Sequence, residues 1–229
     1  MMDPASNQKV LATATALLRL GSTWRFRTEL SGAAPDGEGA IAGDLVLHGT
    51  GDPSLRSGHL DEMAQELVRR GVTRVDGRVL ADPRRLGSDE VAVGRSPLHL
   101  GWSAIEVRVR PGDRVGAAGP ASLYPSSEAF RLVNQTTTAK GRNRVGVSIA
   151  RVGDHFQVTV SGRVGLGRAG VVIRRSPPSD TLYAAIMMRA ALVQAGIEVR
   201  GSAGVFSPDE RVRVASADLE GMHLAVANP

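Results

Sequence analysis

The chain of 229 residues contains no cysteine, and only 3% of its residues are aromatic. The lack of cysteine excludes disulfide bonds, thiolate metal sites and a cysteine nucleophile. Because aromatic residues are scarce, the core must be built mainly from valine, leucine, isoleucine and alanine. Lysine is also rare. Lys9 and Lys140 are the two in the chain, so arginine supplies nearly all of the positive charge.

The net charge of +5 does not by itself indicate a nucleic-acid partner. The arginines are spread along the chain and alternate with acidic residues, whereas a binding surface would need them clustered. We therefore predict no nucleic-acid partner and keep DNA binding as the least favoured alternative. The five histidines show no short metal-ligand spacing, so we also predict no metal site and no cofactor.

Long hydrophobic runs are missing as well. The apolar run from Val10 to Leu20 is interrupted by threonines and an arginine, and it is too short to cross a bilayer. Residues 1–9 lack the basic segment and the apolar core of an export signal. We therefore expect no transmembrane segment and no signal peptide in this chain.

Three helices are predicted from apolar residues at helical spacing, and each pattern ends at a glycine. In the first helix, Asp3 is the expected cap, Pro4 fits the first turn and Gly21 ends the helix. Its apolar stripe is expected to be buried. The stripe consists of Val10, Leu11, Ala14, Leu17 and Leu18. The second helix is predicted at residues 60–70, and the third at residues 180–195, with Leu182, Ile186 and Val193 on one face.

Extended segments dominate the middle of the chain, and Gly153-Asp154 predicts a hairpin between two of them. The G-x-G-x-x-G pattern at Gly165 to Gly170 is interpreted as a turn, because a strand and a proline pair follow it, where a dinucleotide site needs a helix. Trp24 and Trp102 are interpreted as packing residues. The predicted strands are 44–47, 78–81, 107–110, 129–138, 144–149, 155–160, 171–174 and 197–199.

The strongest chemical signal is the S-x-x-K motif formed by Ser6 and Lys9 at the start of the first helix. Residues three apart share a helix face, so the hydroxyl and the amine can approach each other. A serine hydroxyl becomes a good nucleophile when a neighbouring base removes its proton. The motif therefore suggests a serine nucleophile with a lysine base, although S-x-x-K alone is common in helices.

Five segments in the same order resemble the D-alanyl-D-alanine carboxypeptidase/endopeptidase family of penicillin-binding proteins, the low-molecular-mass class with a large insertion after the S-x-x-K motif. The resemblance covers nearly the whole chain and is more specific than the S-x-x-K. The segments are Met2 to Thr28 around the S-x-x-K, Gly43 to Leu55 (GDLVLHGTGDPSL), Val75 to Asp82 (VDGRVLAD), Arg108 to Gly112 (RVRPG) and Leu182 to Gly201.

This resemblance implies a serine-type D-Ala-D-Ala carboxypeptidase, with some members also cutting cross-links as endopeptidases. It implies that Ser6 is the nucleophile and Lys9 the general base, and that an acyl-enzyme forms on peptidoglycan stem peptides. β-Lactams would be inhibitors that acylate the same serine. The parent family works in the periplasm or facing the cell wall.

The sequence departs from the family pattern at two further motifs. The family carries an S-x-N and a K-T-G after its insertion, and neither occurs here. Ser88-Asp-Glu90 and Lys140-Gly-Arg142 come nearest. We therefore expect a truncated member that is weakly active or inactive. Whether it is a fragment, a mis-started gene product or a decayed paralogue stays open, as does the oligomeric state.

The predicted fold class is α+β, with the nucleophile helix as a remnant of the penicillin-binding domain. Residues 1–30 are assigned to that catalytic domain, and residues 206–229 to a tail that leads back towards it. Residues 31–205 form the insertion, which we divide into a mixed α/β part (31–105) and a β-rich part with one helix (106–205).

Two alternative functions remain. The insertion could fold alone and bind peptidoglycan or a wall-synthesis partner without catalysis. Another S-x-x-K hydrolase such as a β-lactamase is the rival within the same class, and the long insertion speaks against it.

Overall fold

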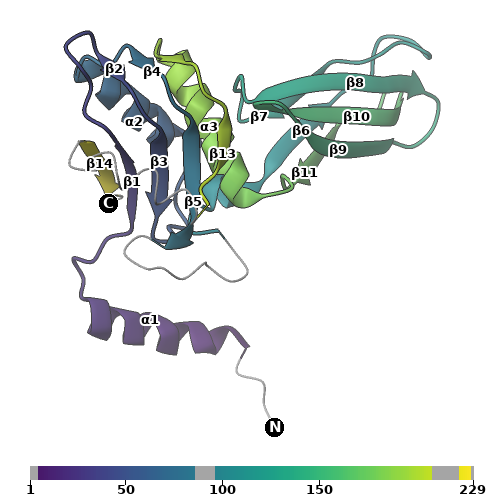
Figure 1. The fold of residues 1–229 in the computed structure, drawn as a ribbon. Coiled ribbons are helices and arrows are strands. Elements are labelled where there is room, and N and C mark those ends of the chain that lie inside the picture. Colours follow the sequence, from purple (N-terminus) through teal and green to yellow (C-terminus); the bar gives the residue numbers. More distant parts are fainter. Residues whose placement is uncertain (1–4, 86–95, 208–221, 228–229) are drawn as a thin grey trace.

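The structure is a computed structural model that describes residues 5–85, 96–207 and 222–227. Figure 1 shows a helix that stands apart near the N-terminus, a layered body of strands and helices, and an arm of strands that extends from the body. The predicted cap at Asp3 and Pro4, the Ser88–Glu90 segment and most of the predicted tail lie outside the described residues.

The body is built on a mixed five-stranded sheet with the strand order β13-β5-β3-β1-β14. β1 pairs antiparallel with both β3 and β14, whereas β3, β5 and β13 run parallel to one another. A small parallel sheet of β2, β4 and β12 adjoins it. The bounds are β1 (Arg27–Gly32), β2 (Ala40–Ile41), β3 (Leu45–Gly49), β4 (Arg74–Val75), β5 (Val79–Arg85), β12 (Glu198–Val199), β13 (Ala203–Val205) and β14 (Met222–Ala227).

Two helices of the body, α2 (Ser57–Arg69) and α3 (Asp180–Gln194), pack against each other. α2 lies on the crossover between the parallel strands β3 and β5, a connection that normally buries a helix against its sheet. α3 is buried on most of its circumference, because it also contacts β5 and β13. The prediction that one face of this helix is buried is therefore only partly correct. Ile186 is buried, but Val193 is exposed.

The arm consists of two three-stranded sheets, with the orders β11-β6-β7 and β8-β10-β9. β9 and β10 form the hairpin predicted around Gly153-Asp154. The glycine-rich segment at 165–170 is the turn that joins β10 to β11, as predicted. The bounds are β6 (Ile105–Val109), β7 (Ala121–Tyr124), β8 (Phe130–Ala139), β9 (Arg144–Val152), β10 (His155–Gly165) and β11 (Val171–Arg175).

An aromatic cluster joins the arm to the body. Phe130 of β8 and Phe156 of β10 pack with Tyr183 of α3, with ring centroids 6.1–6.4 Å apart. These residues belong to one core that runs from the body sheet into the arm. Three of the chain's aromatic residues therefore pack together at the junction of the body and the arm, while aliphatic residues build most of the rest of the core.

The first helix, α1 (Gln8–Leu20), forms as predicted and ends at Gly21, whose φ of 84° is one that glycine adopts readily. The expected burial of its apolar stripe is wrong. Leu18 is 86% exposed, and Val10, Leu11 and Leu17 are also exposed. The periodicity correctly predicts an amphipathic helix, but the described residues place no layer over its apolar face.

The α+β class is confirmed. β12 pairs with β4 and β13 pairs with β5, so both strands belong to the body. The helix and strands of residues 180–205, which the sequence analysis assigns to the β-rich part, therefore pack with the mixed α/β part. The boundaries after residues 30, 105 and 205 stay a proposal.

Candidate active site

Ser6 lies in a 3-10 turn, η1 (Ala5–Asn7), and Lys9 is the second residue of α1. Both side chains therefore sit at the N-terminal end of one helix, as the S-x-x-K spacing predicts. Residues 6–20 are all exposed, and no hydrogen bond joins Ser6 to Lys9 among the described residues. Figure 1 shows α1 away from the body and the arm, so the described elements do not enclose Ser6.

A second serine takes part in an arrangement that the sequence analysis missed. On the face of the body sheet opposite the main core, Ser31 Oγ lies 2.9 Å from His48 Nε2, and His48 Nδ1 lies 3.4 Å from Asp82 Oδ2. Arg84 donates to the same carboxylate through Nε at 2.8 Å. Burial raises the pKa of Asp82, but the hydrogen bonds from His48 and Arg84 outweigh this effect and hold the pKa far below its usual range.

Serine, histidine and aspartate in this order match the nucleophile, base and orienting group of a catalytic triad. Ser31, however, is only 5% exposed, and its strand is paired on both sides, by β3 and β14. Its hydroxyl also lies 3.4 Å from the carbonyl oxygen of Val46. We therefore interpret the cluster as a hydrogen-bonded polar network that ties β1, β3 and β5 together.

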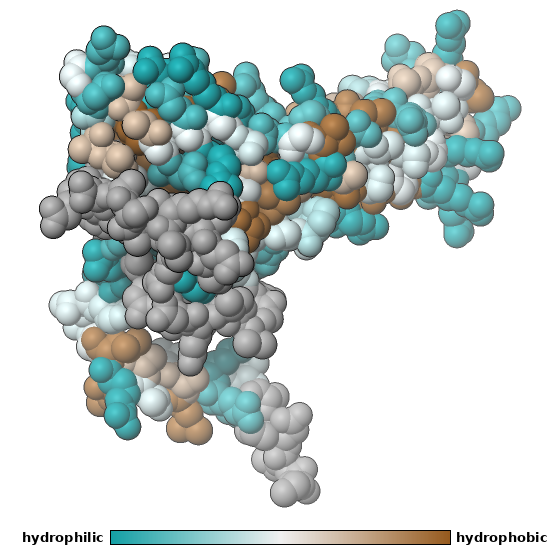
Figure 2. All heavy atoms as spheres, in the orientation of Figure 1, coloured by the Kyte–Doolittle hydropathy of each residue, from teal (hydrophilic) through white to brown (hydrophobic). Residues whose placement is uncertain are grey.

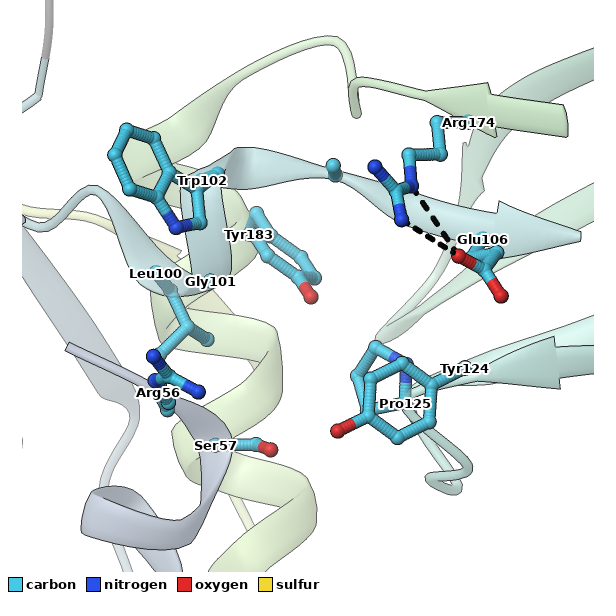
Figure 3. A pocket seen from close by; sticks show the side chains of 11 residues that line it. Arg56, Ser57, Leu100, Gly101, Trp102, Glu106, Tyr124, Pro125, Arg174 and Tyr183 are labelled. Atoms are coloured by element: carbon cyan, nitrogen blue, oxygen red, sulfur yellow. Dashed lines mark hydrogen bonds and ion pairs between the residues drawn. The ribbon is translucent and has the colours of Figure 1, made fainter. Parts of the chain in front are cut away.

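The body and the arm line an open cavity of about 430 Å³, referred to below as the junction cavity. It lies beside the aromatic cluster and receives side chains from the start of α2, the segment before β6, the arm strands and α3 (Figure 3). Its lining residues are Arg56, Ser57, Leu100, Gly101, Trp102, Ala104, Glu106, Tyr124, Pro125, Arg174 and Tyr183.

Charge in the junction cavity is arranged around Glu106 of β6. Arg108 donates to Glu106 Oε1 at 2.7 Å, and Arg174 donates to Oε2 at 3.2 Å. The hydrogen bond from Arg108 holds the pKa of Glu106 below its usual range, and Arg174 adds to this effect. Glu106 is therefore an anion whose two oxygens are both engaged by guanidinium groups.

Trp102 is exposed, although its sequence context is interpreted above as that of a packing residue. It is 65% exposed at the mouth of the junction cavity, within a turn in which Gly101, Trp102 and Ser103 all have positive φ. Ser103 Oγ lies 3.0 Å from His99 Nδ1, which in turn lies 3.3 Å from Asp180 Oδ2 at the start of α3. These contacts hold the turn that presents the indole to solvent. Trp24 is 40% exposed, and its ring packs edge-on against Phe26, with ring centroids 4.5 Å apart.

The described ranges contain no group of three or more histidine, aspartate or glutamate side chains arranged to hold a metal ion. Within the same ranges, no helix is both long and apolar enough to cross a lipid bilayer.

Comparison with known protein families identifies the family of the chain. A profile of the D-Ala-D-Ala carboxypeptidase 3 (S13) family matches residues 1–218, which include the S-x-x-K helix, the arm and all of the body except β14. The chain therefore belongs to this family of serine-type D-Ala-D-Ala carboxypeptidases.

Among curated proteins, the chain is 26% identical over 220 residues to a D-alanyl-D-alanine carboxypeptidase from Actinomadura sp. (strain R39). This match covers 88% of the chain and 41% of the relative. A second relative, the D-alanyl-D-alanine carboxypeptidase DacB of Haemophilus influenzae, is 31% identical over 93 residues, which cover 41% of the chain and 19% of that protein. The chain thus spans less than half the length of the curated relatives it matches.

The fold is also that of solved relatives. Penicillin binding protein 4 from Haemophilus influenzae, in a complex with a β-lactam, superposes with a TM-score of 0.65 at 22% identity. The match covers 90% of this chain and 46% of the relative. A second structure of that protein superposes with a TM-score of 0.63 at 21% identity and covers 90% of this chain and 48% of the relative.

Proposed function

We propose that the chain is part of a serine-type D-Ala-D-Ala carboxypeptidase in which Ser6 is the nucleophile and Lys9 the general base. One observation carries the proposal. The family match includes residues 1–218, and within that range the S-x-x-K lies at the exposed start of a helix. The substrates would be peptidoglycan stem peptides, with cross-links as further endopeptidase substrates.

In the proposed reaction, Lys9 as a neutral amine removes the proton of the Ser6 hydroxyl while Ser6 Oγ attacks the carbonyl carbon of the penultimate D-alanine. The C–N bond to the terminal D-alanine breaks, and that D-alanine leaves with the proton. Water then attacks the acyl-enzyme ester and releases the shortened peptide with regeneration of Ser6. A β-lactam would acylate the same oxygen, as its four-membered ring opens.

The 229 residues by themselves are expected to react slowly. Acyl transfer is accelerated mainly by donors preorganised around the developing oxyanion in a site that excludes water. Ser6 and Lys9 are both exposed, and the described elements do not enclose them. Residual reactivity would therefore come from the serine–lysine pair alone. The whole protein would act in the periplasm or facing the cell wall, as expected for a cell-wall peptidase.

The test is the intact mass of the protein after incubation with a penicillin. The proposal expects a slow mass increase of one opened β-lactam that is absent in Ser6→Ala and strongly reduced in Lys9→Gln. Ser22→Ala, which removes an exposed hydroxyl beyond the end of α1, is the matched control and should be acylated like the wild type. An adduct that persists in Ser6→Ala would contradict the assignment of the nucleophile.

A second candidate function is a non-catalytic module that binds peptidoglycan or a partner. The observation that favours it is that the body and arm share one core to which no residue of α1 contributes. A folded sample that forms no penicillin adduct but is retained on purified sacculi above a control protein would favour this function. Lack of retention on sacculi would contradict it.

A further inference from the structure

The end of the arm that lies farthest from the body carries the excess positive charge of the chain (Figure 1). Three turns meet at this end, between β6 and β7, between β8 and β9, and between β10 and β11. Residues 110–118, 138–144 and 163–170 are called the arm tip below. They include seven basic residues and one acidic residue, a net charge of +6, whereas the whole chain carries +5. Arginines that are spread along the sequence therefore gather in the fold.

Hydrogen bonds hold the three segments of the arm tip together. The amide of Gly116 donates to the carbonyl oxygen of Thr138 at 2.8 Å. Asn143 joins the other two turns, because its Oδ1 accepts from the amide of Gly165 at 2.7 Å and its Nδ2 donates to the carbonyl oxygen of Ala169 at 3.1 Å. The basic side chains are therefore carried by a surface with a defined shape.

The basic side chains of the arm tip lack acidic partners. All seven are exposed, and none forms an ion pair within the ranges that the structure describes. Arg144 of β9 and Arg163 of β10 even lie directly opposite each other in their antiparallel ladder, where like charges destabilise a sheet. An anion bound between them would offset this repulsion. The seven residues are Arg110, Arg114, Lys140, Arg142, Arg144, Arg163 and Arg168.

Two apolar side chains stand among these charges. Val115, in the turn between β6 and β7, is 52% exposed, and Leu166, in the turn between β10 and β11, is 42% exposed. Figure 2 shows hydrophilic side chains around the free end of the arm, with hydrophobic ones between them. Such a combination suits a lipid surface, where cations meet headgroup phosphates while apolar atoms enter the acyl boundary. A soluble polyanion would use the charges but not the apolar side chains.

We propose that the arm tip is a membrane-contact surface that binds the anionic headgroups of a phospholipid bilayer. Arginine suits this role, because its planar guanidinium offers several donors in a geometry that matches phosphate oxygens. Val115 and Leu166 enter the outer edge of the acyl region, so the contact is peripheral. Because the arm lies between its tip and the body, the bound protein holds its body away from the bilayer (Figure 1).

The test measures binding of the 229-residue chain to sedimentable phospholipid vesicles. One set of vesicles is pure phosphatidylcholine, and the other contains about one third phosphatidylglycerol. The proposal expects at least about tenfold tighter binding to the anionic vesicles at low salt, because each basic side chain near the surface adds to the attraction. Binding should fall steeply as the salt concentration rises.

Two double variants of equal net charge locate the contact. Arg142→Gln with Arg144→Gln removes two charges from the arm tip, so binding to the anionic vesicles should weaken at least about tenfold. Arg131→Gln with Arg175→Gln removes two exposed charges from the end of the arm that adjoins the body, and it should bind like the wild type. Equal losses in the two double variants would show that net charge, and not the arm tip, determines binding.

A second comparison separates a bilayer from a soluble polyanion. Val115→Ser with Leu166→Ser keeps every charge and should weaken vesicle binding about tenfold, because less apolar surface leaves water. Val152→Ser changes a valine of similar exposure, 44%, next to the turn between β9 and β10, and it serves as the control. If the first variant binds vesicles like the wild type, and inorganic polyphosphate binds the chain as tightly as the vesicles do, the ligand is a soluble phosphate polymer and the proposal is wrong.

The exposed apolar face of α1 is tested as a rival membrane contact. Leu11→Ser with Leu18→Ser should leave binding to the anionic vesicles unchanged. Loss of binding in this variant while the arm-tip variants bind normally would overturn the proposal, as would equal binding to neutral and anionic vesicles. Far-ultraviolet circular dichroism and the melting temperature verify that each variant is folded. None of these measurements involves acylation of Ser6, so this inference and the proposed function can fail separately.

Discussion

A comparison of two leucines on helices of equal length can test whether the apolar face of α1 is covered by other elements. α1 and α2 both contain 13 residues, but Leu18 of α1 is 86% exposed whereas Leu67 of α2 is fully buried. Leu67→Ala removes buried methyl groups and leaves a cavity, so it is expected to lower the free energy of unfolding by about 2–5 kcal/mol. Leu18→Ala removes groups that water already surrounds, and alanine favours the helix. Its effect should stay within about 0.5 kcal/mol.

The measurement is urea unfolding of both variants, followed by circular dichroism. With a slope of about 2 kcal/mol/M, Leu67→Ala lowers the midpoint by about 1 M or more, and Leu18→Ala leaves it nearly unchanged. An equal loss in the two variants would refute the reasoning, because it would show that the apolar face of α1 is covered when the chain is folded. The expectation drawn from sequence periodicity alone would then have been correct.

Three further substitutions follow from local contacts. Asp82→Asn should lower the free energy of unfolding by about 2 kcal/mol at pH 7. Because the pKa of Asp82 in the folded protein lies below the ordinary 3.8, this difference should shrink as the pH falls below that value, and urea midpoints that differ equally at all pH values would argue against it. Ser179→Ala removes the oxygen that accepts a first-turn amide of α3 and should cost about 1 kcal/mol in thermal unfolding, whereas the exposed Ser176→Ala should cost almost nothing. Gly77→Ala should cost about 1–3 kcal/mol, because a Cβ there would lie 2.4 Å from the carbonyl of Gly43, while Gly43→Ala meets open space and serves as the control.

Features encoded within a few residues could be predicted from the sequence. Each predicted helix forms, because apolar spacing and a terminal glycine are local signals. The S-x-x-K is local in the same sense, so Ser6 and Lys9 could be placed on one helix without knowledge of the fold. The hairpin around Gly153-Asp154 and the turn that contains Gly165 belong to the same group.

Features that depend on which elements meet could not be predicted. Periodicity identifies the apolar face of α1 but cannot say whether another layer covers it. The network of Ser31, His48 and Asp82 requires the register of three strands that are not consecutive in the chain. The junction cavity is harder still, because Arg56 and Tyr183 are 127 positions apart and share no sequence pattern. Both tyrosines of the chain line this cavity, but their positions in the sequence do not indicate that they lie close together in the fold.

The aromatic cluster links the arm to the stability of the whole fold. Phe130 and Phe156 come from the arm, and Tyr183 comes from a helix of the body. Tyr183→Phe keeps the ring and its packing, so its melting temperature should stay close to that of the wild type.

Phe156→Ala should behave in the opposite way. It removes a fully buried ring that packs on Tyr183, so the melting temperature should fall steeply. Thermal unfolding of the wild type and these two variants, followed by circular dichroism, separates the loss of a ring from the loss of a hydroxyl. If both variants melt at the temperature of the wild type, the aromatic cluster does not hold the arm to the body.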